Sequence, residues 1–237
     1  MIVLRCLAIL LSLGIALITP LGAAADQNWS EKRVTLRTGD HIVFFGDSLT
    51  ELAGNVEPKK YVTKGYVGIV RERLAKSHRN IDIEVDWVAT SGHIVPDLLR
   101  RVDKDVIAKQ PTIVVIQIGC NDARRIAKTE FKAALEELID KLRKANIQVI
   151  QCTLTSVGEK HDGTNKDDPK LDEFAQIERQ VASSRKVPII DLRKAFVAYW
   201  KANNPDNKPS GILTYDGNHF NDAGHRLVAE QMLTKFQ

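Results

Sequence analysis

Five apolar runs of strand length alternate with longer amphipathic segments, and this alternation restricts the fold more than any other feature of the chain. Several runs are almost continuous in Val, Ile and Phe, which is typical of parallel strands covered on both faces. The segments between them have helical periodicity, with Pro96 in a first turn and Thr129 and Asn221 as candidate N-caps. The expected strands are 41–45, 81–89, 112–118, 147–154 and 187–192, and the expected helices are 65–76, 95–109, 129–146, 171–186, 193–203 and 221–236.

Strands and helices that alternate in this way predict an α/β fold. We expect a three-layer αβα sandwich around a five-stranded, mainly parallel sheet. The chain has 237 residues, 43% of them hydrophobic, and neither a linker nor an internal repeat divides it. These features predict one domain over 26–237, in which the polar stretch 158–170 is a surface loop.

Residues 1–25 have the composition of a secretory signal peptide. Arg5 precedes an apolar run over 7–18, and small residues form a cleavage site after Ala25. The sequence therefore predicts a protein that is secreted or periplasmic after cleavage near Ala25. An uncleaved membrane anchor is the alternative, although the apolar run is short for a bilayer span. We expect no stable membrane insertion of the mature protein.

The charged residues and the cysteines limit the classes of partner and site. Loss of Arg5 leaves 33 of the 34 basic residues against 30 acidic ones, a net charge of +3, and no basic stripe indicates nucleic-acid binding. Two cysteines remain after the predicted cleavage, Cys120 and Cys152, each near the end of an apolar run. We expect two buried thiols, with a disulfide between them as the alternative.

Blocks of polar residues follow the expected strands or precede the last helix. The carboxyl ends of parallel strands meet at one edge of a sheet, where ligands bind in this class of fold. We therefore expect the blocks to come together in space. They are Gly46-Asp47-Ser48, Ser91-Gly92-His93, Gly119-Cys120-Asn121-Asp122 and Asp216-Gly217-Asn218-His219.

The side chains in these blocks are suited to nucleophilic catalysis. A serine hydroxyl needs a base to take its proton, imidazole titrates near neutral pH, and a carboxylate on the other ring nitrogen orients the imidazole. We expect Ser48 to be the nucleophile, His219 the base and Asp216 the orienting carboxylate. The N–H groups of Ser48 and Gly92 and the amide of Asn121 would form the oxyanion hole.

The blocks resemble those of the SGNH, or GDSL-type, hydrolases, and the resemblance runs through nearly the whole chain after residue 25. The four residues that name the family fall on Ser48 of FGDSLTE, Gly92 of ATSGH, Asn121 of GCND and His219 of DGNH. Further segments look like those of microbial acetylesterases and lipases. The resemblance implies a flavodoxin-like fold and ester hydrolysis through an acyl-enzyme, with no metal or other cofactor.

Residues beside the blocks are candidates for the substrate pocket. The two aspartates among them are expected to hold turns by accepting hydrogen bonds from backbone N–H groups. Trp87 and Ala89 stand where many relatives carry Asn and Gly, which predicts a changed turn before Gly92. The candidate pocket residues are Asp47, His93, Asp122 and Tyr215.

The sequence thus predicts an exported serine esterase for a small-molecule or carbohydrate ester with a short acyl group such as acetyl. Lysophospholipase or thioesterase activity is an alternative that acyl-chain preference would reveal. A metal-dependent phosphoesterase is a second alternative, and a non-catalytic carbohydrate-binding protein is a third. The oligomeric state is not predicted. The residues that could hold the metal are Asp47, Asn121, Asp122, Asp216 and His219.

Overall fold

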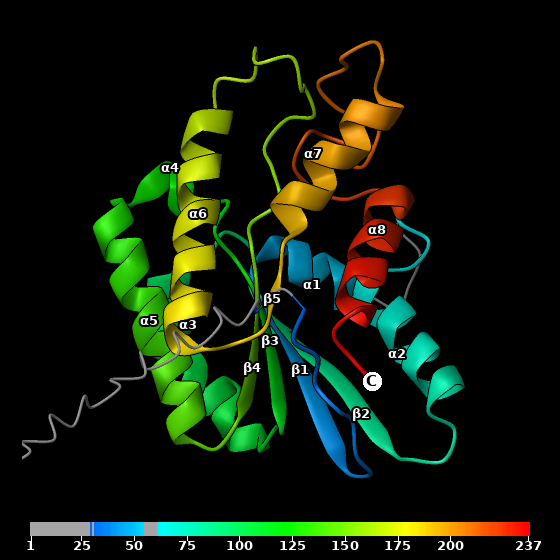
Figure 1. Cartoon of the computed structure of the whole chain (residues 1–237), viewed down its shortest axis with the longest axis vertical. Coiled ribbons are helices and arrows are strands. Elements are labelled where there is room, and N and C mark those ends of the chain that lie inside the picture. Colours follow the sequence, from blue (N-terminus) through cyan, green and yellow to red (C-terminus); the bar gives the residue numbers. More distant parts are fainter. Residues whose placement is uncertain (1–28, 30, 55–60) are drawn as a thin grey trace, which may run out of the picture.

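The sheet consists of five parallel strands in the order β2-β1-β3-β4-β5 (Figure 1). The computed structural model describes residues 29, 31–54 and 61–237, so the predicted signal peptide over 1–25 lies outside the described residues. The five-stranded sheet is confirmed, and every pairing is parallel. The strands are β1 Asp40–Gly46, β2 Ile83–Ala89, β3 Ile113–Gln117, β4 Gln148–Cys152 and β5 Ile189–Ile190.

Helices cover both faces of the sheet, which confirms the α/β sandwich. On one side α2 contacts α1 and α8, and α8 contacts α7, while on the other side α5 contacts α3 and α6 (Figure 1). Within the described residues, no helix has both the length and the apolar character needed to cross a bilayer. The helices are α1 Ser48–Gly54, α2 Tyr66–Ser77, α3 Val95–Asp105, α4 Asp122–Arg125, α5 Lys128–Lys144, α6 Asp168–Arg185, α7 Leu192–Asn203 and α8 Asp222–Leu233, with a 3-10 turn at Ile107–Lys109.

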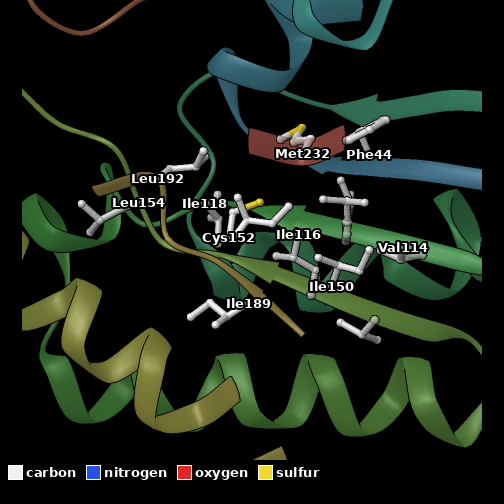
Figure 2. Close-up of a cluster of buried hydrophobic side chains, with 14 of the residues drawn as sticks. Phe44, Val114, Ile116, Ile118, Ile150, Cys152, Leu154, Ile189, Leu192 and Met232 are labelled. Carbon is white, nitrogen blue, oxygen red and sulfur yellow. The ribbon is translucent and has the colours of Figure 1, made fainter. Parts of the chain in front are cut away.

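The apolar runs form central strands because helices bury them on both faces. The side chains over 42–45 in β1 and 113–116 in β3 are inaccessible to solvent. Each large apolar side chain buried in this way contributes about 1.5–3 kcal/mol relative to exposure. Figure 2 shows part of this core, in which side chains of β1, β3, β4 and β5 lie together with Met232 of α8.

Several boundaries differ from the sequence-based expectation. The short helices α1 and α4 were not predicted, because seven and four residues are too few to show a helical period. Thr129 is not an N-cap, since α5 begins at Lys128 after Ala127. Asn221 is confirmed as the N-cap of α8, where its side chain accepts hydrogen bonds from the Ala223 and Gly224 N–H groups.

The strand order places the ends of β1 and β3 at a topological switch point. Successive strands step outward in opposite directions from these two neighbours, which leaves a crevice at their carboxyl ends. Gly46 allows the ends of β1 and β3 to lie close together, because a Cβ atom on it would lie 2.3 Å from the Gln117 carbonyl oxygen. Ser48 follows β1 and Asn121 follows β3, so both lie at this switch point.

Candidate active site

Ser48 is the first residue of α1, and Asp47 alone separates it from Gly46, the last residue of β1. The Asp47 carboxylate accepts a hydrogen bond of 3.0 Å from the Leu49 N–H. The backbone carbonyl oxygen of Asp47 accepts hydrogen bonds from the N–H groups of Thr50 and Glu51. This turn fixes the serine on a short helix rather than on a flexible loop. Only 8% of Ser48 is exposed, so approach to its hydroxyl is confined to one side.

Ser48, His219 and Asp216 form a continuous hydrogen-bonded chain. The His219 Nε2 atom lies 3.2 Å from Ser48 Oγ, and the His219 Nδ1 atom lies 2.7 Å from Asp216 Oδ2. With a proton on Nδ1, the imidazole donates to the carboxylate and Nε2 is left to accept the serine proton. The structure therefore brings together the three residues that the sequence assigned to nucleophile, base and orienting carboxylate.

The backbone of one turn holds Asp216 in place beside His219. The second carboxylate oxygen, Oδ1, accepts hydrogen bonds from the N–H groups of Asn218 and His219, at 2.9 and 2.7 Å. Burial acts to raise the pKa of Asp216, but these bonds and the His219 side chain together lower it. Asp216 therefore stays ionised beside the imidazole.

A buried glutamate that sequence reasoning missed supports this turn. Glu159 is fully buried, and its carboxylate accepts four hydrogen bonds, from the N–H groups of Ile212, Leu213 and Thr214 and from the Thr214 hydroxyl, at 2.7–2.9 Å. The expectation that 158–170 is a surface loop is therefore wrong at its start. In the sequence, Glu159 is one acidic residue in a charged stretch, and such a stretch is typical of a loop exposed to solvent.

The second strand-end block contributes the backbone of Gly92. Gly92 has φ of +78°, a conformation that side-chain-bearing residues rarely adopt. Among the residues that the structure describes, neither the Ser48 N–H nor the Gly92 N–H has a hydrogen-bond acceptor. Both N–H groups are therefore available as donors, and their role in an oxyanion hole stays a prediction.

Asn121 lies between two hydrogen-bond acceptors at the end of β3. Its Nδ2 atom donates to Asp47 Oδ2 at 3.2 Å and to the His93 carbonyl oxygen at 3.1 Å. Burial raises the pKa of Asp47 to about 6, and the Leu49 N–H, the His219 charge and the Asn121 amide oppose this rise. The amide thus ties the nucleophile turn to the Gly92 loop, and its role as an oxyanion donor stays a prediction.

Arg125 is a second residue that sequence reasoning missed. Its Nη1 atom donates to the Gly92 carbonyl oxygen at 2.6 Å, and its Nη2 atom lies 3.5 Å from Asn121 Oδ1. The guanidinium therefore contacts two of the three expected oxyanion residues. Its position four residues after Asn121 would have indicated a shared helix face only if α4 had been expected.

The four candidate pocket residues divide into two groups. Asp47 and Asp122 are buried. Asp47 holds the turn at Ser48, as expected, whereas Asp122 joins α4 to the start of α3 instead of holding a turn. Asp122 accepts from the Val95 N–H at 2.7 Å, and burial raises its pKa to about 7. His93 and Tyr215 form the second group, whose rings contact other side chains. The His93 ring lies 3.4 Å from the Arg101 guanidinium, and the Tyr215 ring stacks on the ring of His219.

The acidic side chains that could bind a metal are directed to other partners. Asp47 and Asp122 accept backbone hydrogen bonds on the inner side of the site, whereas Asp216 bonds His219 at the outer side. Over residues 29, 31–54 and 61–237, no group of three or more His, Cys, Asp or Glu side chains is arranged to hold a metal ion.

Residues 44–227 match the model of the GDSL-like lipase/acylhydrolase family, a stretch that contains Ser48, Gly92, Asn121 and His219. The chain belongs to this family. It is an SGNH-type ester hydrolase, as the resemblance in its sequence implied. The matched range also contains every helix and strand of the described chain except the first part of β1 and the end of α8.

Relatives of this SGNH hydrolase include acetylxylan esterases. The acetylxylan esterase of Geobacillus stearothermophilus is 27% identical over 83% of this chain and 93% of its own. The uncharacterized protein YpmR of Bacillus subtilis strain 168 is 25% identical over 97% of this chain and 94% of its own. Both relatives are therefore similar to this chain over nearly the whole SGNH domain.

Solved structures of acetyl xylan esterases have the same fold as this chain. The crystal structure of the acetyl xylan esterase AlAXEase has a TM-score of 0.76 and 34% identity, covering 82% of this chain and 98% of that one. A variant of Axe2 from Geobacillus stearothermophilus has a TM-score of 0.73 and 25% identity, covering 84% and 95%. Variants described as catalytic mutants of Axe2 replace a serine, an aspartate and a histidine.

Proposed function

We propose that the protein removes acetyl groups from acetylated carbohydrate by a serine esterase mechanism. The observation that carries the mechanism is the hydrogen-bonded chain from Ser48 Oγ through His219 to Asp216. The acetyl group and the carbohydrate are supported by the relatives that are named acetylxylan esterases and by the export signal expected in residues 1–25.

In the first half of the reaction, Ser48 Oγ attacks the carbonyl carbon of the ester. His219 Nε2 takes the serine proton, and Asp216 stabilises the imidazolium that forms. The N–H groups of Ser48 and Gly92 bind the oxyanion, and the Asn121 amide joins them by exchanging one of its two present hydrogen bonds for one to the oxyanion. Removing one such donor typically lowers the rate by a factor of about 10²–10³. The imidazolium then gives its proton to the leaving sugar oxygen, and the C–O bond breaks.

In the second half, water releases the acyl group from Ser48. His219, neutral again, takes a proton from water as the oxygen attacks the acyl carbon, and the same three groups bind the second oxyanion. The proton returns from His219 to Ser48 Oγ as the acetate leaves. Free sugar, acetate and the original enzyme result, with no cofactor consumed.

The mechanism is tested by labelling and by kinetics on one set of variants. Treatment with a fluorophosphonate, followed by peptide mass spectrometry, should give one adduct, on Ser48. Ser48→Ala should abolish the adduct and reduce p-nitrophenyl acetate hydrolysis by at least about 10⁴-fold. Ser77→Ala, an exposed serine at the end of α2, is the matched control. An adduct elsewhere, or activity that survives in Ser48→Ala, would refute the mechanism.

The substrate is tested by acyl-chain length and by the alcohol that is released. Activity should be highest on acetyl and fall on butyryl and octanoyl p-nitrophenyl esters, and acetylated xylan fragments should release acetate. A preference for long acyl chains, for a lysophospholipid or for a thioester would replace the carbohydrate proposal and leave the serine mechanism intact.

A further inference from the structure

Three aromatic rings form a row that starts at the catalytic histidine. The ring of His219 lies 5.8 Å from that of Tyr215 with an interplanar angle of 20°, and Tyr215 lies 4.9 Å from Tyr61 at 17°. Tyr61 is 48% exposed and is the one large hydrophobic side chain among the described residues that is exposed. The row therefore ends in an aromatic ring that is open to solvent.

The segment that carries Tyr61 is anchored to the same part of the chain as His219. The Thr63 N–H and hydroxyl donate to the two carboxylate oxygens of Asp222, at 2.6 and 2.7 Å. Asp222 is the first residue of α8 and follows His219 by three positions. A two-pronged bond of this kind restricts the backbone beside Tyr61, so the ring is held in a fixed relation to the catalytic histidine.

The surroundings of the row are polar. The Asp216 side chain is 41% exposed next to Tyr215, and Asn218 lies beside His219. Within the part of the chain that the structure describes, a short row of rings among polar groups does not make the long apolar groove that a fatty acyl chain would need. It suits a sugar ring, whose C–H face packs on an aromatic face while its hydroxyl groups bond polar neighbours at the edge.

We propose that Tyr61, supported by Tyr215, is a binding site for a glycosyl unit of an oligosaccharide substrate. Because Tyr215 lies between Tyr61 and His219, a sugar on the other face of Tyr61 has two rings between it and the histidine. Tyr61 therefore binds a sugar unit other than the acetylated one, and it selects oligosaccharides over simple acetate esters. This inference rests on the proposed carbohydrate substrate and adds to it a site for the second unit.

The kinetic test compares two substrates in one variant series. The ratio of kcat/KM on an acetylated xylotriose to kcat/KM on p-nitrophenyl acetate should fall about three- to tenfold in Tyr61→Ala, through KM of the oligosaccharide, since stacking of this kind contributes roughly 0.5–1.5 kcal/mol. Tyr61→Phe and Tyr61→Trp keep the ring and should keep the ratio within about twofold. An unchanged ratio in Tyr61→Ala, whether or not both rates fall, would overturn the proposal.

A binding measurement separates this inference from the proposed function. Calorimetric titration of the Ser48→Ala protein with unacetylated xylotetraose should show binding that weakens in the Ser48→Ala, Tyr61→Ala double variant. If the wild type does not hydrolyse acetylated oligosaccharides but this binding is seen and depends on Tyr61, the proposed function fails and the glycosyl site stands. If xylotetraose does not bind, or binds equally to both proteins, the glycosyl site is refuted.

Discussion

The Arg125 guanidinium donates a hydrogen bond of 2.6 Å to the carbonyl oxygen of Gly92, a residue 33 positions earlier in the chain. The bond joins the loop after β2 to the short helix α4 after β3. We therefore expect Arg125 to position the Gly92 backbone in the proposed oxyanion hole.

Replacement of Arg125 should reduce turnover more than substrate binding. Hydrogen bonds from charged groups contribute about 1.5–3 kcal/mol, so Arg125→Ala should lower kcat on p-nitrophenyl acetate about tenfold or more with little change in KM. The neighbouring Arg124, whose guanidinium lies 4.0 Å from Asp167, gives the control Arg124→Ala. Equal kinetics in the two variants would show that the bond to Gly92 does not support catalysis.

Asp216→Asn should keep the fold of its turn and lose most of the activity. The asparagine oxygen can still accept from the Asn218 and His219 N–H groups, but an amide facing Nδ1 favours the wrong tautomer of the imidazole. We expect kcat to fall by about 10³–10⁴-fold, with a melting temperature close to that of the wild type. Asp206→Asn, on an exposed side chain, is the control, and a loss of less than tenfold in Asp216→Asn would contradict the assigned role.

Loss of the Glu159 carboxylate should destabilise the protein as well as its active site. Glu159→Ala leaves four donors without their acceptor, three of them buried, each a cost of about 1–3 kcal/mol that entering water partly offsets. We expect the free energy of unfolding in urea to fall by about 2–4 kcal/mol. Glu137→Ala, on an exposed position of α5, should change it by less than about 0.5 kcal/mol.

Asp122 should make the protein less stable as the pH rises through neutrality. Its folded pKa, about 7, lies above the usual value, so the folded state binds more protons than the unfolded state between about pH 4 and pH 7. The stability that the protonated group contributes is lost as the pH rises through the folded pKa.

Asp122→Asn tests this sign directly, since the amide oxygen can still accept from the Val95 N–H. The free energy of unfolding in urea should be measured for both proteins from pH 4 to pH 8. Over this range the value for the wild type should fall relative to that of the variant by on the order of a few kcal/mol. A constant difference between the two proteins across this range would contradict the raised pKa.

The two thiols of the described chain should be unreactive until the protein unfolds. Cys120 and Cys152 are both free and buried, which confirms the expectation of thiols, and burial raises the pKa of Cys120 to about 12 and that of Cys152 further. Iodoacetamide at pH 8 should leave both unmodified in the native enzyme and alkylate both in urea without reductant, as read by peptide mass spectrometry. A native adduct on either cysteine would contradict the buried placement.

The sheet was predictable from sequence because each strand is a dense apolar run. The side chains over 42–45 and 113–116 had no environment available except a core covered on both faces, so the strands and their parallel pairing followed from composition. The blocks at their ends then had to share one edge of the sheet. This reasoning placed Ser48 and Asn121 in one site without any knowledge of distances.

The supporting residues were not predictable, because their roles depend on contacts between distant segments. Glu159 is an acidic residue in a charged stretch until the chain folds and brings Leu213 and Thr214 to its carboxylate. Arg125 and Tyr61 are likewise ordinary surface residues in the sequence. Their contacts with Gly92 and Tyr215 are set by short helices and loops, which carry no periodic signal.

Ser48, the proposed nucleophile, and His219, its proposed base, are separated by 171 residues, and this has a consequence for the growing polypeptide. A ribosome completes all five strands before it adds the segment with Asp216 and His219. The serine is therefore made early and stays chemically inert while the sheet assembles around it. Hydrolytic activity is the last property the nascent chain acquires, because a chain that ends before residue 216 has the residues of all five strands but lacks Asp216 and His219.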